Sequence, residues 1–189
     1  MVQNNINGSL NKWANIDWRE KGHPFWVSFF FINELTIKQM NTDIRVAEVG
    51  LTYKNRVPSK DRKEVLDSRS AYSILKEIYS DDTIDYRETF KVLYLNRRNQ
   101  VLGYYTISEG GLTDTMADVR MILQGALLTN ATGIILAHNH PSGTLKPSKE
   151  DDRLTRRIVE AADIMNIRVN DHIILTSEGF YSYDDEGRI

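Results

Sequence analysis

The pattern of hydrophobic and polar positions changes near residue 40. Residues 1–39 hold all three tryptophans but show no sustained helical or strand period, whereas regular periods follow from Met40 onward. We therefore divide the chain into an N-terminal extension (1–39), a strand and loop segment (40–66) and a main domain (67–189). Met40 is a candidate internal start, and the alternative is that the extension packs its aromatic residues on the domain or on a partner.

Three stretches of the chain have apolar residues at the spacing of an amphipathic helix. The first begins at Asp67/Ser68, the second begins near Thr115–Asp118, and the third runs from Ser148 to about Met165. Each begins at a Ser, Thr or Asp residue, whose side chain can cap the first turn.

Six stretches have the pattern of strands. Most contain β-branched or aromatic residues with turn residues between them, and one is a continuous apolar run typical of a buried strand. They are 44–53, 90–95, 102–107, 133–137, 168–175 and 180–183. Helices and strands are therefore intermixed along the chain, which predicts an α/β or α+β fold with a mixed sheet.

Composition narrows the choice of function. The net charge of −2 provides no general attraction to nucleic acid or to an anionic membrane. The chain has no cysteine, so disulfides and thiolate metal sites are excluded, and any metal must be held by nitrogen and oxygen. The apolar stretch near the start, at 29–32, is far too short to span a bilayer. We expect a cytoplasmic protein with no membrane partner.

Candidate chemistry lies between residues 138 and 151. His138 and His140 follow the buried strand, and alternate side chains of a strand share a face, so the two imidazoles can point to one place. Ser148 and Asp151 follow at the start of the third helix, where the simpler interpretation is a capping pair. Two imidazoles and one carboxylate would bind a metal ion and leave a coordination position for water.

The combined pattern resembles a known motif. His-x-His, seven residues, Ser, two residues and Asp is similar to the JAMM (MPN+) metalloprotease-type signature. The wider context of residues 137–143, with 155–157 and 171–174, resembles the RadC-like branch of that superfamily over roughly residues 68–183. The resemblance implies a JAB/MPN-type domain, in which a cytidine-deaminase-like mixed β-sheet is flanked by helices.

The resemblance also implies roles for particular residues. His138, His140 and Asp151 would bind Zn²⁺, although the residue types are also compatible with Fe²⁺ or Mn²⁺. Ser148 would donate a hydrogen bond to the developing oxyanion. Glu88, which immediately precedes a predicted strand, would be the general acid and base. Glu109 is the rival for that role, and the alternative for Glu88 is an exposed loop residue without function.

Four further residues could also be proposed for a site: the other two histidines of the chain, and Ser142 and Asn139 beside the motif. His172 is expected to be a packed residue or a neighbour of a ligand, although a second metal site is the alternative. His23 has no partner in the pattern and is incidental. Ser142 lacks the base that a nucleophile needs, and Asn139 only completes a His-Asn-His tripeptide that does not indicate a nuclease.

These observations predict a zinc-dependent hydrolase of the JAMM type that cleaves a peptide or isopeptide-like amide. The alternatives are a repair or recombination factor that acts through DNA or a repair protein, and a non-catalytic interaction module. Longer RadC-like proteins have a helix-hairpin-helix region associated with DNA, but residues 1–83 lack its glycine-rich hairpin signature.

Overall fold

The computed structural model of the protein describes residues 50, 52–110 and 117–189. Contacts gather in a unit that spans Leu51–Ile189, and its described residues form a five-stranded sheet in the order β2-β1-β3-β4-β5. The strands are β1 (Thr89–Leu95), β2 (Val101–Glu109), β3 (Gly133–Asn139), β4 (Arg168–Leu175) and β5 (Phe180–Ser182). The helices are η1 (Ser59–Asp61), α3 (Ser68–Ile78), α4 (Asp81–Ile84), α5 (Val119–Thr129) and α6 (Lys149–Ile164).

The sheet is mixed, as the sequence predicts. β1 is antiparallel to both β2 and β3, β4 is antiparallel to β5, and β3 and β4 are parallel. A parallel pair needs a crossover connection, and α6 provides it between β3 and β4. The predicted fold class is therefore confirmed.

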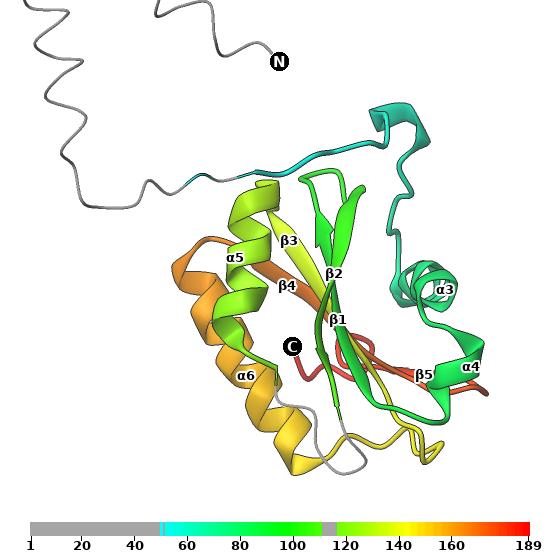
Figure 1. Ribbon diagram of the computed structural model, residues 1–189. Helices are drawn as coiled ribbons and strands as arrows, with labels where there is room; N and C mark the ends of the chain where they lie inside the picture. The colour runs from blue at the N-terminus through cyan, green and yellow to red at the C-terminus, as the bar shows by residue number, and fades with distance from the viewer. Residues whose placement is uncertain (1–49, 51, 111–116) are drawn as a thin grey trace, which may run out of the picture. The chain divides into compact units, whose positions relative to one another are not determined.

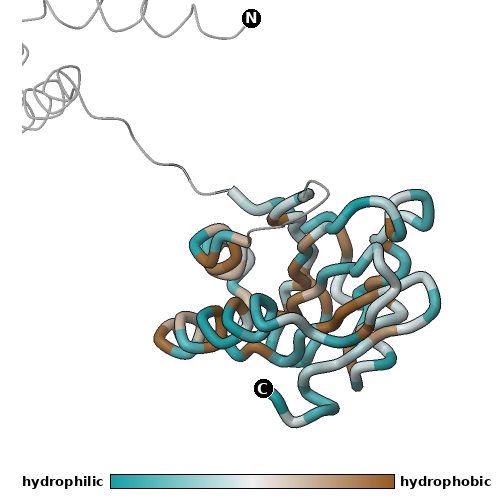
Figure 2. The backbone as a smooth tube through the Cα atoms, turned by 90° about the horizontal axis from the view of Figure 1, so that it is seen from below, coloured by the Kyte–Doolittle hydropathy of each residue, from teal (hydrophilic) through white to brown (hydrophobic). Residues whose placement is uncertain are grey.

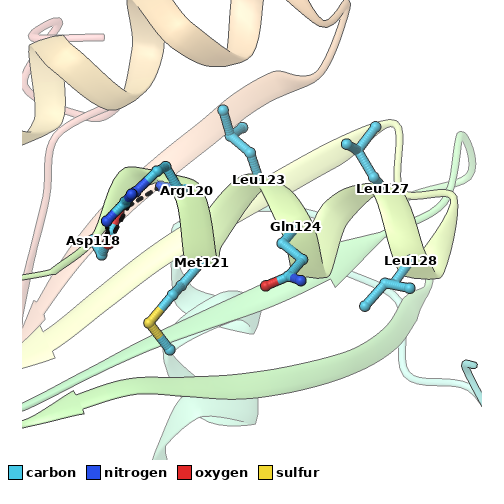
Figure 3. Close-up of a pocket in the computed structure, with 7 residues that line it drawn as sticks. All are labelled: Asp118, Arg120, Met121, Leu123, Gln124, Leu127 and Leu128. Carbon is cyan, nitrogen blue, oxygen red and sulfur yellow. Dashed lines mark hydrogen bonds and ion pairs between the residues drawn. The ribbon is translucent and has the colours of Figure 1, made fainter. Parts of the chain in front are cut away.

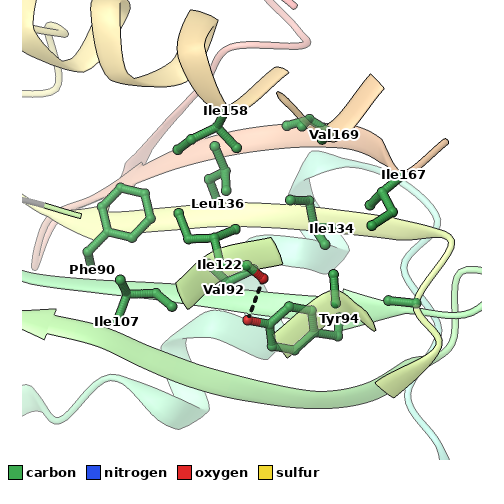
Figure 4. Packing of buried hydrophobic residues seen from close by; sticks show 13 residues of the cluster. Phe90, Val92, Tyr94, Ile107, Ile122, Ile134, Leu136, Ile158, Ile167 and Val169 are labelled. Atoms are coloured by element: carbon green, nitrogen blue, oxygen red, sulfur yellow. Dashed lines mark hydrogen bonds between the residues drawn. The ribbon is translucent and has the colours of Figure 1, made fainter. Parts of the chain in front are cut away.

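Helices cover both faces of the sheet (Figure 1). α5 and α6 lie on one face, and α3 and α4 lie on the other. Because side chains alternate along a strand, Phe90, Val92 and Tyr94 of β1 pack toward α5 and α6 (Figure 4), whereas Leu93 and Leu95 pack toward α3. Hydrophobic residues concentrate in the central strands and alternate with polar ones along the helices (Figure 2).

Helix α5 lies very close to β1. The Tyr94 hydroxyl donates to the Ile122 carbonyl at 3.2 Å (Figure 4), and a Cβ added at Gly125 would lie 2.1 Å from the Tyr94 oxygen. The glycine is therefore required at this position by packing, although glycine is a poor helix former.

Most predicted elements are observed, with shifted ends. β3 continues two residues beyond its apolar run, through His138 and Asn139. The single-turn elements η1 and α4 were not predicted, because one turn is too short to show a period. Of the predicted strand at 44–53, residues 44–49 and 51 lie outside the described residues, as does the extension 1–39, and residues 50, 52 and 53 have no regular structure.

Among the helices that the structure describes, none has the length and apolar character needed to cross a membrane.

Candidate metal centre

The topology places the start of α6 beside the carboxyl end of β3. The chain leaves β3 at Asn139, enters α6 at Lys149, and returns to begin β4 next to the first residue of β3, where Gly133 pairs with Arg168. The first turn of α6 therefore lies near His138, although Asp151 is thirteen positions further along the chain. Ligand sites in open α/β sheets form at such carboxyl ends.

Three side chains converge there. His138 Nε2 lies 3.3 Å from Asp151 Oδ1, His140 Nε2 lies 3.6 Å from Asp151 Oδ2, and the two Nε2 atoms are 2.9 Å apart. Two ligands of a tetrahedral zinc ion with bonds of ~2.0–2.1 Å are separated by about 3.3 Å. Among the described residues, His138, His140 and Asp151 form the group that could hold a metal ion.

The two histidines are held in different ways. His138 is buried on the α6 face of β3, and its ring stacks on Phe90 at a centroid distance of 5.9 Å and an interplanar angle of 5°. His140 lies one residue beyond β3, and its Nδ1 is 2.6 Å from the Thr144 carbonyl. A carbonyl only accepts, so His140 donates from Nδ1, and Nε2 is the nitrogen that faces Asp151 and offers a lone pair to a cation when the ring is neutral.

Asp151 has two roles, one at the helix cap and one in the cluster. Its amide donates to Ser148 Oγ at 3.0 Å, and its Oδ2 accepts from the Ser148 amide at 2.7 Å, so the predicted capping pair is confirmed. The same carboxylate faces both histidines. The cap therefore orients the candidate ligand. Ser148 Oγ accepts one bond here, and its hydroxyl hydrogen can still be donated.

Burial and charge shift the pKa values of the cluster in different directions. Burial lowers the pKa of His138 to about 4. Burial alone would also lower the pKa of His140, but Asp151, the Thr144 carbonyl and Glu88 outweigh it and raise that pKa. For Asp151, burial would raise the pKa, but bonds from His140 and Ser148 and the nearby His138 ring lower it. Electron-rich nitrogen and oxygen atoms thus meet in a poorly solvated place, which suits a bound cation.

Glu88 lies closer to this cluster than Glu109 does. It directly precedes β1, whose Phe90 pairs with His138, and its charge raises the pKa of His140. Glu109 ends β2, which is one strand further from β3, and it is exposed and paired with Arg87 at 3.6 Å. Glu88 is half-buried, which argues against the alternative that it is an exposed loop residue without function.

Asn139 is a contributor that the sequence interpretation missed. Its buried side chain lies on the face opposite His138, where Nδ2 donates to the carbonyls of Ile84 and Arg87 and Oδ1 accepts from the Thr89 amide. These bonds hold the chain on both sides of Glu88. A polar residue at the end of an apolar strand was the available signal.

The remaining candidates are not part of the cluster. His172 is fully buried behind His138, with its Nε2 2.8 Å from His138 Nδ1. The Asp171 carboxylate instead accepts from Ser182 Oγ, so these neighbours do not form a second metal site in the described part of the chain. Ser142 is exposed in a turn, and His23 lies outside the described residues.

A separate pocket lies along the outside of α5 (Figure 3). Its lining is mostly apolar and includes Met121, Leu123 and Leu127, with Asp118 and Arg120 at one end. None of the candidate metal ligands lines it, so we do not connect it with the site above.

Comparison with known proteins places the chain in a family. Residues 65–188 match the family model described as the RadC-like JAB domain, and the chain therefore belongs to the RadC-like JAB domain family. The mixed sheet flanked by helices is consistent with that domain. The family resemblance seen in the sequence is confirmed.

Curated relatives agree with this assignment. The chain is 40% identical over 136 residues to a UPF0758 protein of Porphyromonas gingivalis, covering 70% of the chain and 59% of the relative. It is 39% identical over 125 residues to a UPF0758 protein of Flavobacterium johnsoniae, covering 66% and 53%, respectively. With the Escherichia coli UPF0758 protein YfjY it shares 42% identity over 101 residues, covering 53% and 63%. The chain thus spans somewhat more than half the length of these relatives.

We predict that Asn139 stabilises the protein strongly. Asn139→Ala leaves three backbone groups without their partner, at a cost of ~1–3 kcal/mol for each group that water does not reach. Asn139→Asp is expected to cost more, because a carboxylate oxygen would face the Ile84 and Arg87 carbonyls. Urea unfolding measures the loss. The control is Asn170→Ala, which removes one contact of 3.4 Å, and equal stability of Asn139→Ala and this control would contradict the prediction.

We also predict that the metal-free protein loses stability as the pH falls from about 6.5 to about 4. The pKa of folded His138 is lowered to about 4, and that of folded His172 lies well below its usual range, so the unfolded chain takes up these protons first. His138 alone contributes on the order of 3 kcal/mol, and the raised pKa of His140 opposes this. Urea unfolding of chelator-treated protein across this range is the measurement. Constant or rising stability toward acid would refute the prediction.

Proposed function

We propose that this protein is a metal-dependent hydrolase of the JAMM type that uses Zn²⁺ to cleave a peptide or isopeptide-like amide. The observation that carries the proposal is the convergence of His138 Nε2, His140 Nε2 and the Asp151 carboxylate at the carboxyl end of β3. Membership of the RadC-like JAB domain family supports it. The alternative of a repair factor that acts through DNA stays a prediction from the family resemblance.

The donor set suits a catalytic ion. Two neutral imidazoles and one carboxylate leave a net positive site with a coordination position for water or substrate, which is the usual composition of catalytic zinc centres. When bound, zinc supplies a Lewis acid and brings the pKa of a bound water to ~7. Asp151 and His140 are each about 15% exposed, so the site can be reached from solvent.

The protein's own groups then handle the proton and the developing charge. Glu88 is the carboxylate whose charge already acts on His140, and it would accept the proton of the attacking water and return it to the leaving nitrogen. Ser148 would donate its hydroxyl hydrogen to the carbonyl oxygen as negative charge develops there. One such donor lowers a barrier by ~2.7–4 kcal/mol.

The first prediction of this proposal concerns metal content. Purified protein is expected to hold about one zinc per chain, since three protein ligands and one open position define a catalytic zinc site. His138→Ala and Asp151→Ala should each lose it, whereas Ser142→Ala, in the same turn region but outside the cluster, should retain it. Elemental analysis by mass spectrometry measures this. Full zinc occupancy in either ligand variant would end the assignment.

The second prediction separates metal binding from catalysis. Glu88→Gln should keep wild-type zinc content and lose amide hydrolysis by roughly 10²–10⁴-fold, because it removes the proton carrier and no ligand. The matched control is Glu109→Gln, which should hydrolyse at the wild-type rate. A panel of fluorogenic peptides and isopeptide-linked substrates provides the assay. If Glu109→Gln is the inactive variant and Glu88→Gln is active, the assigned role belongs to Glu109.

A further inference from the structure

A continuous row of buried hydrogen bonds runs from α6 to the back of His138. Thr155 Oγ1 lies 2.7 Å from the Asp151 carbonyl and 2.6 Å from His172 Nδ1. His172 Nε2 lies 2.8 Å from His138 Nδ1. Thr155 and His172 are 3% and 0% exposed, and neither belongs to the group of candidate ligands.

The hydroxyl of Thr155 determines which atom donates the hydrogen in each bond of this row. A carbonyl oxygen only accepts, so the single hydroxyl hydrogen of Thr155 is donated to Asp151 O. The Thr155 oxygen must then accept from His172, which therefore carries its hydrogen on Nδ1. The opposite direction would place the Thr155 and Asp151 oxygens 2.7 Å apart with no hydrogen between them.

The same reasoning continues to the candidate ligand. A neutral imidazole has one N–H group, so Nε2 of His172 is an acceptor and His138 must donate to it from Nδ1. The Nε2 of His138 then has a lone pair, and this atom is the one that faces Asp151 and His140. In the opposite direction a hydrogen would occupy that nitrogen and block coordination.

Packing holds the rings in the required orientation. His172 stacks on Tyr183 at a centroid distance of 4.8 Å and an angle of 15°, and Phe90 stacks on His138. The Tyr183 hydroxyl donates to Asp152 Oδ1 at 3.0 Å, which ties this aromatic residue to α6 as well. These stacking contacts, together with the hydrogen bonds of the row, restrain the planes of both imidazoles.

We propose that Thr155 and His172 are positioning residues that hold His138 in its Nδ1–H tautomer and so prepare its Nε2 to bind the cation. This inference rests on the proposed metal-dependent function. Helix α6 thus acts twice: Asp151 supplies a ligand directly, and Thr155, one turn later, orients a second ligand through His172. A metal-binding histidine commonly makes a hydrogen bond through the ring nitrogen that does not bind the metal, and this bond sets the tautomer. Loss of such a bond costs roughly 10–100-fold in metal affinity.

The decisive variant is Thr155→Val, which keeps the branched shape and removes the hydroxyl. Its control is Thr155→Ser, which keeps the hydroxyl and removes only the methyl group. The first measurement is the histidine tautomer in metal-free protein, read by nitrogen-15 NMR, with only four histidines to assign. In the wild type and in Thr155→Ser we expect the hydrogen on Nδ1 of both His138 and His172. In Thr155→Val we expect a population with the hydrogen on Nε2 of His138.

The second measurement is zinc affinity by chelator competition. Thr155→Val should bind zinc roughly 10–100-fold more weakly, and Thr155→Ser should bind close to the wild type. Unchanged tautomer and affinity in folded Thr155→Val would overturn the inference, and so would wild-type His138 with its hydrogen on Nε2. If Thr155→Val does not fold, the wild-type tautomer decides alone. Wild-type protein with the expected tautomers but no zinc binding would refute the proposed function. The assigned donors and acceptors of the bonds between Thr155, His172 and His138 would still hold.

Discussion

The parallel pairing of β3 with β4 is the constraint on which the rest of the site depends. Parallel neighbours cannot be joined by a hairpin, so the chain must cross over through α6, and the first turn of that helix lies beside the carboxyl end of β3. The capping pair of Ser148 and Asp151, which any helix of this kind would favour, is thereby brought to the two histidines. A capping residue at the start of a helix thus becomes a candidate metal ligand because the crossover places it beside the two histidines.

Because side chains alternate along a strand, neighbouring residues of β3 face opposite layers and have different roles. His138 faces α6 and joins the cluster, whereas Asn139 faces the other layer and holds the backbone on both sides of Glu88. The candidate metal ligand His138 and the residue that holds the backbone around the proposed proton carrier are consecutive in the chain. Behind them, Thr155 and His172 connect the helix to the back of His138, whereas Thr144 holds His140 and Ser148 holds Asp151.

Much of the fold could be predicted from periodicity. The apolar faces of α3 and α6 and the apolar run of β3 each have a length and spacing that indicate their type, and their observed bounds differ from the predicted ones by one or two residues. The ends were less predictable, because the polar residues His138 and Asn139 extend β3 through tertiary hydrogen bonds. α4 was missed because a single turn has no period.

The order of residues alone is sufficient to indicate the candidate ligands, since the combination of His138, His140 and Asp151 resembles a metal-binding motif although Asp151 alone has a simpler role in a helix cap, and it also excludes thiolate sites. It does not show what Asn139 and Thr155 do, although both lie in the stretches that resemble the RadC-like branch, because both act on groups distant in the chain. Those roles arise only when the sheet and α6 assemble. Hydrogen bonds depend on distances of a few ångströms, and the crossover between parallel strands creates those distances.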